Sequence, residues 1–584
     1  MRRDSIVVLK FGSSVLRGEH DLWPVVHEIY RWVREGKHVV AVVSAFAGET
    51  DRLLTHAARY GRCSNPDALA RLVAIGEQTS AALLGLALDR AGIPAQVLDA
   101  AQIGFVAHGP ILDAEPQSIH AQKILRVLES GAVAVIPGFV AGQEDGGTAL
   151  LGRGGSDLSA LFITERLGAQ CCLIKDVDGL YDCDPAVAGA GARRFSTLTW
   201  EEAIALGGGV VQPKAIAFAR QHGQSFEVRA LGSSNATVIG PGPNEIDFEP
   251  SSEVAAPVSV ALLGLGTCGL GVYRQLAAHP ELFNVVGIAV RNPERHHGDA
   301  PAQLLTSDCW SVIERADVVI ELIGGCSPAT ELISEALAAG KHVVTANKLV
   351  LAASGPELAR LATEQGARLL HSAAAGAAVP VLERLRQIAR ETEIEEVTAV
   401  LNGTTNFILD RFSQGQSFDE ALRQAQAEGF AEADPTEDLN GTDAACKLVL
   451  LAHAAFNTDI ARELVEREGI EHIDPAETRV LCAAGKKIRL VASLQRCDGR
   501  IMARVKPQVL DCEHPLATTR DERNCVLIRT RGGTSILRGR GAGRWPTTVS
   551  VMADLFDLVR DVRHPPEPLA AEAHETDQEI PCEI

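Results

Sequence analysis

Charged side chains gather in residues 429–447, where their types and spacing could do chemistry. Asp443 and Lys447 are four residues apart at the start of a strongly apolar run that predicts a helix, so they share one face of it. Such a spacing usually marks an ion pair on the surface. An apolar helix has little use for an outward pair, however, and Glu432 and Asp438 crowd the loop in front. Carboxylates can hold a substrate ammonium while a lysine supplies a proton at a carbonyl, so we expect a catalytic site here.

A second chemical signal lies in residues 148–157, TALLGRGGSD, which run into an apolar helical stretch. Consecutive glycine amides ahead of a helix form a concave site for an anion, and Arg153 offers a fork for a carboxylate or a phosphate. No GKS or GKT occurs, so this is not a Walker loop. Farther on, residues 176–184 contain four aspartates in nine positions. They form either a solvated turn or, beside an anion site, groups that orient Mg²⁺ or a nucleotide.

A glycine turn in the middle of the chain predicts a dinucleotide site. Residues 258–271, VSVALLGLGTCGLG, read as a strand, a tight turn and the start of a helix. Gly264 permits the turn, Gly266 lets the backbone approach a pyrophosphate, and Gly269 lets helix and strand pack closely. The motif alone is weak evidence, but the strand and the helix supply its expected context. Arg291 follows the next predicted strand, and an arginine there accommodates a 2′-phosphate, which favours NADP(H) while NAD(H) stays possible.

These groups need strands and helices to hold them, and the apolar pattern supplies both. In residues 1–247, short apolar runs alternate with helical patterns, and each run ends in small or polar residues. That alternation predicts a parallel α/β sheet with its ligands at the carboxyl ends of the strands. Residues 248–257 are rich in Pro, Glu and Ser and read as a linker. Residues 565–584 read as a disordered tail.

Length and composition set outer limits on function. The 584 residues are 46% hydrophobic and 22% charged, which suits roughly three or four soluble domains. A formal charge of −20 without a long Lys/Arg run argues against nucleic acid and membranes as partners. The 13 cysteines include no CxxC pair, and we expect no metal site built from His or Cys. We find no signal sequence and no apolar run long enough to span a bilayer, so we expect a cytoplasmic protein.

Six motifs in the first part of the chain carry a resemblance to a known family. They are, in order, KFGSSV, VVSA, IGEQTSAALL, TALLGRGGSD, DVDGLYDCDP and VVQPKAIAFA. This part resembles the aspartate kinases of the amino-acid-kinase superfamily, which implies a parallel-sheet αβα domain and phosphorylation of the aspartate side chain by ATP with Mg²⁺. By position, the resemblance gives the substrate to Glu77, Arg153, Ser156 and Ser44, and the nucleotide and its phosphoryl charge to Lys10, Gly12, Ser13, Asp176, Asp178, Tyr181 and Lys214.

Some positions depart from the usual pattern of that family. Ser13 and Ser14 stand where glycine and threonine are common, and Lys175 replaces a frequent threonine. Ala186 stands in place of an arginine, which weakens the expected contact with the nucleotide. An alternative is therefore a kinase-like domain that has lost catalysis and only binds a ligand or regulates.

A second set of motifs runs from about residue 258 to residue 562: GLGTCGLG, ELIGG, TANK, LNGTTNFIL, EGFAEADPTEDLNGTDAACKL and GRGAGRWPTTVSV. This part resembles the homoserine dehydrogenases, which implies a Rossmann domain, an α+β substrate and dimerisation domain, and hydride transfer between NADP(H) and aspartate semialdehyde or homoserine. The resemblance implies that Lys447 is the leading acid and base, with Lys348 and Asp443 in the catalytic group. It assigns substrate binding to Glu432, Asp438 and Asp443, and cofactor contacts to Gly264, Gly266, Thr267, Gly269, Arg291, Asn347, Lys348 and Gly541.

Together the two resemblances predict an α/β chain with two activities of the route to lysine, threonine and methionine. They imply a homodimer or a higher homo-oligomer. The linker leaves no room for the ACT regulatory domains that often follow aspartate kinases, so we expect weak feedback inhibition. Residues 371–380, which often bind a monovalent cation in the second family, depart from its pattern, so we assign no metal site. The expected domains are the kinase (1–247), the linker (248–257), the Rossmann domain (258–390), the substrate domain (391–545), a return to the Rossmann domain (546–564) and the tail (565–584).

Overall fold

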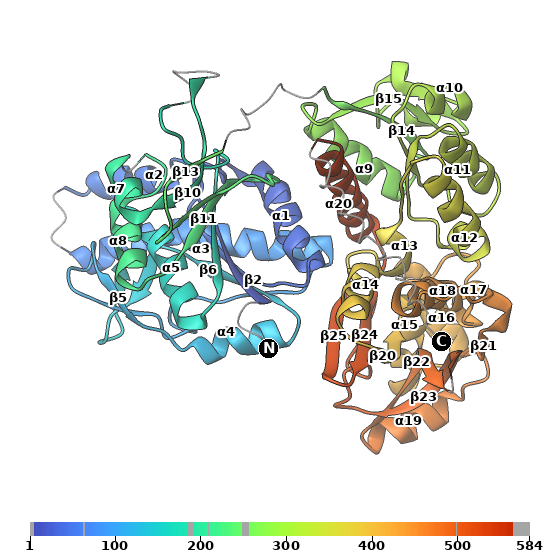
Figure 1. Ribbon diagram of the computed structural model, residues 1–584. Coiled ribbons are helices and arrows are strands. Elements are labelled where there is room, and N and C mark those ends of the chain that lie inside the picture. The colour runs from blue at the N-terminus through green and yellow to red at the C-terminus, as the bar shows by residue number, and fades with distance from the viewer. Residues whose placement is uncertain are drawn as a thin grey trace, which may run out of the picture.

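The computed structural model describes residues 5–61, 65–184, 191–207, 209–247, 256–497 and 499–563 (Figure 1). These residues form one half built on a large sheet and a second half built on two six-stranded sheets, with a small accessory sheet beside the first. Most of the predicted linker, the predicted tail and Ala186 lie outside the described residues. The α/β fold class predicted from the alternating pattern is confirmed.

The large sheet of the first half is parallel through its centre. Alternate residues of β1 (Ile6–Phe11) face opposite cores, with Val8 in one hydrophobic cluster and Val7 and Leu9 in the other. Both faces are therefore covered, which is why each central strand reads as a continuous apolar run. The sheet order is β13 (Glu245–Ile246), β10 (Phe195–Thr199), β12 (Thr237–Gly240), β11 (Phe226–Ala230), β9 (Gln170–Lys175), β1, β2 (His38–Val43), β6 (Val133–Pro137) and β3 (Ala95–Val97).

Helices cover the two faces of this sheet. Residues of α1 (Leu22–Arg34) join the cluster of Val7 and Leu9, whereas residues of α5 (Gly155–Leu167) join the cluster of Val8. The other helices are α2 (Glu49–Ala58), α3 (Pro66–Ala91), α4 (Ala121–Glu129), α7 (Trp200–Ala205) and α8 (Pro213–Gln221), and the accessory sheet has the order β5 (Glu115–Ser118), β4 (Val106–His108), β7 (Val140–Gly142) and β8 (Thr148–Leu150).

The helix α3 is long and apolar enough to span a membrane, although the sequence predicts no such stretch. Within the described residues it alone has the length and hydropathy of a spanning helix, and 44% of that stretch is buried in the domain. It also carries Glu77 in its buried part. We therefore interpret α3 as a core helix, because the cores of soluble proteins contain helices of the same composition.

The first sheet of the second half is wholly parallel and has the order of a dinucleotide-binding fold. The strands, in sheet order, are β16 (Leu305–Thr306), β15 (Phe283–Ala289), β14 (Val258–Leu263), β17 (Val318–Glu321), β18 (His342–Thr345) and β19 (Leu369–Leu370). Its helices are α9 (Thr267–Ala278), α10 (Cys309–Glu314), α11 (Ala329–Ala338), α12 (Lys348–Glu364) and α20 (Arg544–Arg563).

The last sheet is antiparallel except at its first edge, where β21 and β23 run parallel, and it forms the floor of the substrate domain. Its order is β21 (Glu466–Arg467), β23 (Arg500–Asp511), β22 (Lys486–Cys497), β20 (Ile394–Val400), β24 (Arg523–Thr530) and β25 (Gly533–Arg540). Its helices are α13 (Ser372–Gly376), α14 (Val381–Glu391), α15 (Gly403–Ser413), α16 (Phe418–Ala427), α17 (Thr436–Leu439), α18 (Thr442–Phe456) and α19 (Pro475–Ala483).

The packing places one domain boundary earlier than the sequence suggests. We assigned residues up to 390 to the Rossmann domain, yet Val381, Leu382 and Leu385 of α14 lie in the same hydrophobic cluster as α18. The Rossmann sheet itself ends with β19. By its packing, α14 therefore belongs to the substrate domain, a boundary that no apolar pattern in the sequence marks.

The two halves of the chain share a hydrophobic cluster, although a linker joins them. Ala378, Val549 and Ala553 of the second half lie in one cluster with α1 of the first. Trp23 stacks on Trp545 with ring centroids 4.7 Å apart. The helix α20 thus lies against α9 of the Rossmann domain and against α1 and α3 of the first half (Figure 1).

Candidate active sites

The glycine turn after β14 has the shape that the sequence predicts. Gly264 has a φ of 97°, and a Cβ there would lie 2.7 Å from the carbonyl oxygen of Leu322. A Cβ on Gly269 would lie 2.2 Å from the carbonyl oxygen of Gly264, so the start of α9 packs directly on the turn. Apart from its neighbours along the chain, no described residue places an atom within 4 Å of a Cβ built on Gly266. The turn therefore leaves room for a ligand at the N-terminus of α9, as a pyrophosphate requires.

Glu321 and Asn347 lie at the same edge of the Rossmann sheet as the glycine turn. The strands β14, β17 and β18 are parallel neighbours, with Leu263 opposite Glu321 and Glu321 opposite Thr345. The buried carboxylate of Glu321 accepts a hydrogen bond from the hydroxyl of Thr345 at 2.6 Å. Asn347 caps the N-terminus of α12 and donates to the carbonyl oxygen of Gly325 at 2.7 Å. These bonds fix the first residue of α12 at the ligand edge of the sheet.

Asp443 lies between two lysines that come from different domains. Lys348, the first residue of α12, places its Nζ 2.9 Å from Oδ1 of Asp443, and Lys447 places its Nζ 2.8 Å from Oδ2. Lys447 also donates to the carbonyl oxygen of Leu401 at 2.7 Å. Asp443 is 4% exposed and Lys447 is 8% exposed, which excludes a surface ion pair. The Rossmann edge and the substrate domain thus meet at this carboxylate.

Asn402 joins Asp443 to a second carboxylate, that of Asp438. Its Nδ2 donates to Asp443 at 2.8 Å and to Asp438 at 2.6 Å. Its Oδ1 accepts the N–H of Thr405 and so caps α15. The hydroxyl of Thr404 donates to the other oxygen of Asp438 at 2.8 Å. Two carboxylates are therefore held in fixed positions beside Lys447.

The charges of this cluster stabilise one another. Burial alone would raise the pKa of Asp443, but the ammonium groups of Lys447 and Lys348 hold it well below its usual value. Burial would lower the pKa of Lys348, but Asp443 raises it above its usual value. At neutral pH the site therefore presents an ionised carboxylate and ammonium donors, which suits a substrate oxygen that gains negative charge.

In the first half, Asp157 also lies between two lysines. Lys10 at the end of β1 is 2.6 Å from its Oδ1, and Lys175 at the end of β9 is 2.9 Å from its Oδ2. All three side chains are buried. Burial lowers the pKa of Lys10 to about 8, although Asp157 opposes that shift. Burial would raise the pKa of Asp157, but Lys10 and Lys175 lower it. Two ammonium groups at one strand edge suit the charge of a phosphoryl group in transfer.

Polar groups from two other elements lie at this edge of the sheet. Ser44 follows β2, and its Oγ lies 2.8 Å from the Oγ of Ser156 at the start of α5. Glu77 of α3 is 4% exposed, and its Oε2 has no hydrogen-bond partner within the described residues. Burial raises the pKa of Glu77 to about 7. A buried carboxylate oxygen without a partner is costly, so Glu77 suits a cationic ligand.

Family models match this sequence in three successive segments. The model of the amino acid kinase family matches residues 5–229, that of the NAD binding domain of homoserine dehydrogenase matches residues 264–372, and that of homoserine dehydrogenase matches residues 380–556. The homoserine dehydrogenase of Corynebacterium glutamicum is 37% identical over 334 residues, covering 54% of this chain and 75% of that protein. The chain belongs to the homoserine dehydrogenase family.

Other homoserine dehydrogenases show the same relationship. That of Mycobacterium leprae is 40% identical over 323 residues, covering 52% of this chain and 73% of that protein. The crystal structure of a homoserine dehydrogenase from Thiobacillus denitrificans matches with a TM-score of 0.51 and 37% identity, covering 53% of this chain and 75% of that one. This homoserine dehydrogenase therefore carries an amino acid kinase domain in front, and the fusion predicted from the motifs is confirmed.

The residues predicted for the dehydrogenase site fall into two groups. The first group is joined by contacts: Lys447, Lys348, Asp443 and, through Asn402, Asp438. The second group is not joined to it by any hydrogen bond or ion pair within the described residues. The exposed side chains of Glu432, Thr267 and Arg291 belong to it, as does Gly541, whose Cβ would overlap the side chain of Asn524.

The residues predicted for the nucleotide site of the kinase domain divide in the same way. Tyr181 donates to Asp178 at 2.7 Å, and burial together with that carboxylate raises the pKa of Tyr181 to about 12. Lys214 donates to Asp113 at 2.8 Å and to the carbonyl oxygen of Leu151 at 3.1 Å, beside the glycine nest.

The remaining predicted kinase residues make fewer contacts. A Cβ on Gly12 would lie 2.9 Å from Nζ of Lys10, so glycine leaves room for that ammonium. Arg153, Ser13 and Asp176 are exposed, and Arg153 makes no hydrogen bond or ion pair within the described part of the chain. These three positions are where a ligand, rather than another side chain, would have to supply the partner.

Sequence reasoning missed two members of the kinase site. Asp157 is only the last letter of the glycine nest in the sequence, and Lys175 registers there only as a departure from the family pattern. The structure pairs Asp157 with Lys10, and it pairs Lys175 with the other oxygen of Asp157. Their positions at the ends of a nest and of a strand were the available signal, because ligands lie at such ends in parallel sheets.

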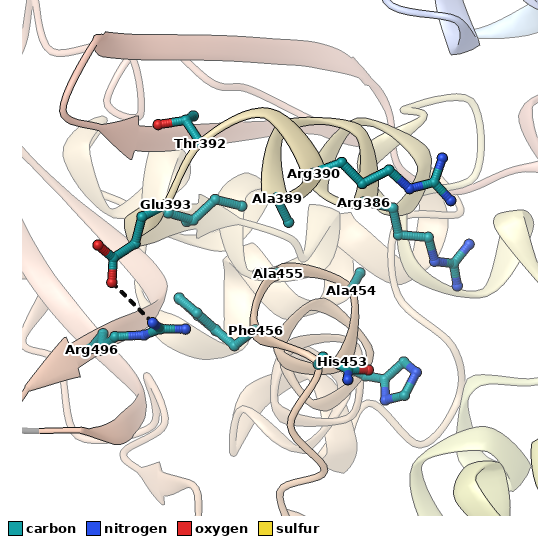
Figure 2. A pocket seen from close by; sticks show the side chains of 12 residues that line it. Arg386, Ala389, Arg390, Thr392, Glu393, His453, Ala454, Ala455, Phe456 and Arg496 are labelled. Atoms are coloured by element: carbon teal, nitrogen blue, oxygen red, sulfur yellow. Dashed lines mark hydrogen bonds and ion pairs between the residues drawn. The ribbon is translucent and has the colours of Figure 1, made fainter. Parts of the chain in front are cut away.

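An open crevice of about 500 Å³ lies away from both sites, at the C-terminal ends of α14 and α18 (Figure 2). It is lined by Arg386, Arg390, His453 and Arg496, and Arg496 pairs with Glu393 at 3.0 Å. Cations stabilise the C-terminal ends of helices, which explains Arg386 and Arg390 of α14 without a ligand. The crevice lies at the end of α18 opposite to the catalytic cluster.

Proposed function

We propose that this chain catalyses two reactions of aspartate metabolism. The second half interconverts L-aspartate 4-semialdehyde and L-homoserine with NAD(P)H, and the first half transfers a phosphoryl group from ATP to the side chain of L-aspartate, which gives 4-phospho-L-aspartate. The observation that carries the dehydrogenase assignment is Asp443 between Lys348 and Lys447 at the ligand edge of a Rossmann sheet.

Lys447 exchanges the proton in the dehydrogenase reaction. Its ammonium has three N–H donors, and Asp443 and the carbonyl oxygen of Leu401 take two of them. The third donates to the substrate carbonyl oxygen and protonates it as the alcohol forms. The chemistry that a bound nicotinamide cofactor would supply is the hydride for the carbonyl carbon. In the oxidation of homoserine, the amine of Lys447 accepts the hydroxyl proton instead.

Lys348 and the two carboxylates hold the substrate in place. The ammonium of Lys348, fixed at the start of α12, keeps Asp443 ionised and adds positive charge beside the reacting oxygen. Asp438 binds the ammonium of the amino acid, because its oxygens are already oriented by Asn402 and Thr404. Glu432, on the exposed loop before Asp438, completes the acidic surround.

NADP(H) is the proposed cofactor. The open backbone at Gly266 fits the pyrophosphate, and Thr267 and Gly269 belong to the same helix start. Arg291 follows β15, where the adenosine ribose lies in Rossmann folds. Its exposed guanidinium has no hydrogen bond or ion pair within the described residues, so it is available to a 2′-phosphate.

In the kinase half, the residues fit ATP and aspartate. Lys10 and Lys175 neutralise the phosphoryl charge, and Glu77 binds the aspartate ammonium. Within the described residues no three Asp, Glu, His or Cys side chains converge on a metal site. Asp176 and Asp178 would be the side chains that hold a Mg²⁺ ion brought in with the nucleotide, since Mg²⁺ at phosphates needs only one or two protein carboxylates.

Assays on one preparation of the full chain test both proposals. We expect NADP⁺-dependent oxidation of homoserine, and formation of an acyl phosphate that depends on both ATP and aspartate. The alternative is a homoserine dehydrogenase whose kinase-like domain only binds a ligand. An active dehydrogenase that forms no acyl phosphate would support that alternative, whereas a lack of hydride transfer would overturn the main proposal.

We also propose a cytoplasmic homodimer or higher homo-oligomer. The location is supported by the cysteines of the described residues, which are all free. The oligomer is supported only by the resemblance to the dehydrogenase family. Light scattering of the purified chain measures its mass directly, and a monomer at assay concentrations would contradict the oligomer.

A further inference from the structure

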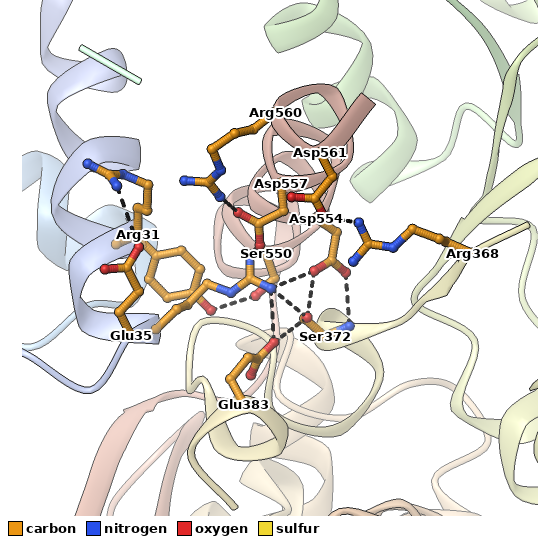
Figure 3. Close-up of polar contacts among 12 residues, drawn as sticks. Arg31, Glu35, Arg368, Ser372, Glu383, Ser550, Asp554, Asp557, Arg560 and Asp561 are labelled. Carbon is orange, nitrogen blue, oxygen red and sulfur yellow. Dashed lines mark hydrogen bonds and ion pairs between the residues drawn. The ribbon is translucent and has the colours of Figure 1, made fainter. Parts of the chain in front are cut away.

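Arg34, the last residue of α1 in the kinase domain, inserts its side chain into the dehydrogenase. The side chain is 9% exposed. Its Nη2 lies 3.0 Å from Oγ of Ser372, 3.0 Å from Oε1 of Glu383 and 2.7 Å from Oδ1 of Asp554. Its Nη1 lies 2.9 Å from Oδ2 of Asp557. Figure 3 shows these partners coming from the start of α13, from α14 and from α20.

Without Arg34, the dehydrogenase would hold two carboxylates around one hydroxyl. Ser372 Oγ lies within hydrogen-bond distance of a carboxylate oxygen of Glu383 and of one of Asp554, and its single proton can serve only one of them at a time; the N–H of Ser372 donates to Asp554 at 3.0 Å. Glu383 and Asp554 therefore approach each other closely in a buried place. Within the described residues, Arg34 is the one cation in direct contact with both of them. Like charges at such a distance cannot both stay ionised without a counter-ion.

A second kinase residue holds the same segment of the dehydrogenase. The hydroxyl of Tyr30 lies 2.7 Å from that of Ser550, and both bond to the carbonyl oxygen of Ala377. Ala377 has a φ of 45° and a ψ of −113°, a backbone conformation that costs energy for a residue with a side chain. Residues 372–377 are thus fixed at one end by Arg34 and at the other by Tyr30.

This segment supports the catalytic helix directly. Ala374 and Ala375 of α13 lie in one hydrophobic cluster with Ala444 and Leu448 of α18, and α14 packs along the same helix. Asp443 and Lys447 lie on α18 between those packed positions. Closely packed helices transmit small displacements, and the catalytic groups tolerate little of it.

We propose that Arg34 is a positioning residue for the dehydrogenase reaction. It is a buried cation of the kinase domain that neutralises carboxylates of the dehydrogenase. The proposal rests on the proposed homoserine dehydrogenase activity. It makes the kinase domain part of the working dehydrogenase whether or not the kinase itself is active. Arg34 acts on α13 and α14, and through them on α18, and it does not contact the substrate.

The test compares R34M with D89N in the full chain. Asp89 also forms an ion pair between the halves, with Arg540 at 2.9 Å, but its side chain is 58% exposed and lies outside the Arg34 cluster. We expect R34M to lower kcat for homoserine oxidation by about ten- to a hundred-fold, as small misplacements of catalytic groups do. We expect D89N to keep the wild-type rate and R34K to retain part of it.

Chemical rescue separates charge balance from general loosening. Guanidinium ion at millimolar concentration supplies the positive charge that R34M lacks, so we expect it to raise kcat, whereas urea at the same concentration has no charge and should not. A second variant, R34M/D554N, removes one of the two repelling carboxylates and should recover activity relative to R34M. If R34M alone does not fold, the double variant R34M/D554N tests the same charge balance in a folded protein.

The outcomes are distinguishable from failure of the proposed function, because wild-type activity is measured in the same assay. Circular dichroism and the unfolding temperature show whether each variant is folded. A folded R34M with the wild-type rate would overturn the proposal. So would a slow R34M that neither guanidinium nor D554N improves, since the defect would then not come from a missing cation.

Discussion

The ammonium of Lys348, in the Rossmann domain, lies 2.9 Å from the carboxylate of Asp443, in the substrate domain. The same carboxylate holds Lys447 at 2.8 Å. The Asp443 carboxylate therefore links the cofactor side of the site to the proton donor. The first prediction concerns that donor.

The variant K447A should lose homoserine oxidation by about a thousand-fold, which is within the range for removal of a general acid and base. NADPH affinity, measured by fluorescence titration, should stay unchanged, because Lys447 contacts Asp443 and Leu401 rather than the glycine turn. The control is K486A, since Lys486 is a half-exposed lysine that pairs with Asp511. Equal activity of K447A and the control would exclude Lys447 as the acid and base.

The buried Glu77 predicts a pH dependence of aspartate binding in the kinase domain. Burial raises the pKa of Glu77 to about 7, and an ammonium ligand needs the ionised form. Aspartate affinity should therefore weaken as the pH falls below 7. In E77Q, titration calorimetry should find weak binding at every pH, and a variant that kept the wild-type profile would exclude Glu77 from this role.

The same residue predicts a pH dependence of stability without ligand. Its pKa is higher in the folded protein than the ordinary value of 4.5, so its contribution is full below pH 4.5 and is lost as the pH rises through 7. The loss should be about 3 kcal/mol of unfolding free energy. Denaturant unfolding of wild type and E77Q at pH 5 and pH 8 checks this, since E77Q should lack that difference.

The second lysine beside Asp157 predicts a shift in the pH profile of the kinase. Burial and the charge of Lys175 together lower the pKa of Lys10 to about 8, although Asp157 opposes them. In K175M the pKa of Lys10 should rise, so acyl phosphate formation should begin to fall at a higher pH than in wild type. The exposed Lys123 provides the control variant K123M. An unchanged alkaline limb would show that Lys175 does not act on Lys10.

Arg291 predicts the choice between the two nicotinamide cofactors. The variant R291S should raise the KM for NADPH by about ten-fold, as expected for loss of a charge-assisted contact to phosphate. The KM for NADH should not change, because NADH lacks the 2′-phosphate. R274S removes another exposed arginine of the same domain and serves as the control. Equal effects on both cofactors would remove the basis for an NADP preference.

The sequence predicts the local parts of both sites well. The fingerprint around Gly264 and the spacing of Asp443 and Lys447 depend on neighbours along the chain, and both appear in the structure as expected. The partners that come from distant segments were not predictable in this way. Asp157 lies between Lys10 and Lys175 because β1 and β9 pair in the sheet and α5 packs against both strands.

The contact between the halves lies beyond what sequence patterns can predict. Arg34 and Asp554 are 520 positions apart, and nothing in the sequence distinguishes either from an ordinary charged residue. A linker between two families suggests independent folding, whereas Ala378 and Val549 lie in a cluster with kinase residues. Only the assembled fold shows that their helices pack together.

The position of α20 has a consequence for any shortened form of this protein. Val549 and Ala553 pack against kinase residues. Removal of the N-terminal half would therefore expose an apolar strip of α20 to solvent. A truncated dehydrogenase would tend to aggregate unless polar side chains replaced the apolar ones of that strip. Proteolytic cleavage of the linker, by contrast, should leave the two halves associated, because they share a hydrophobic cluster.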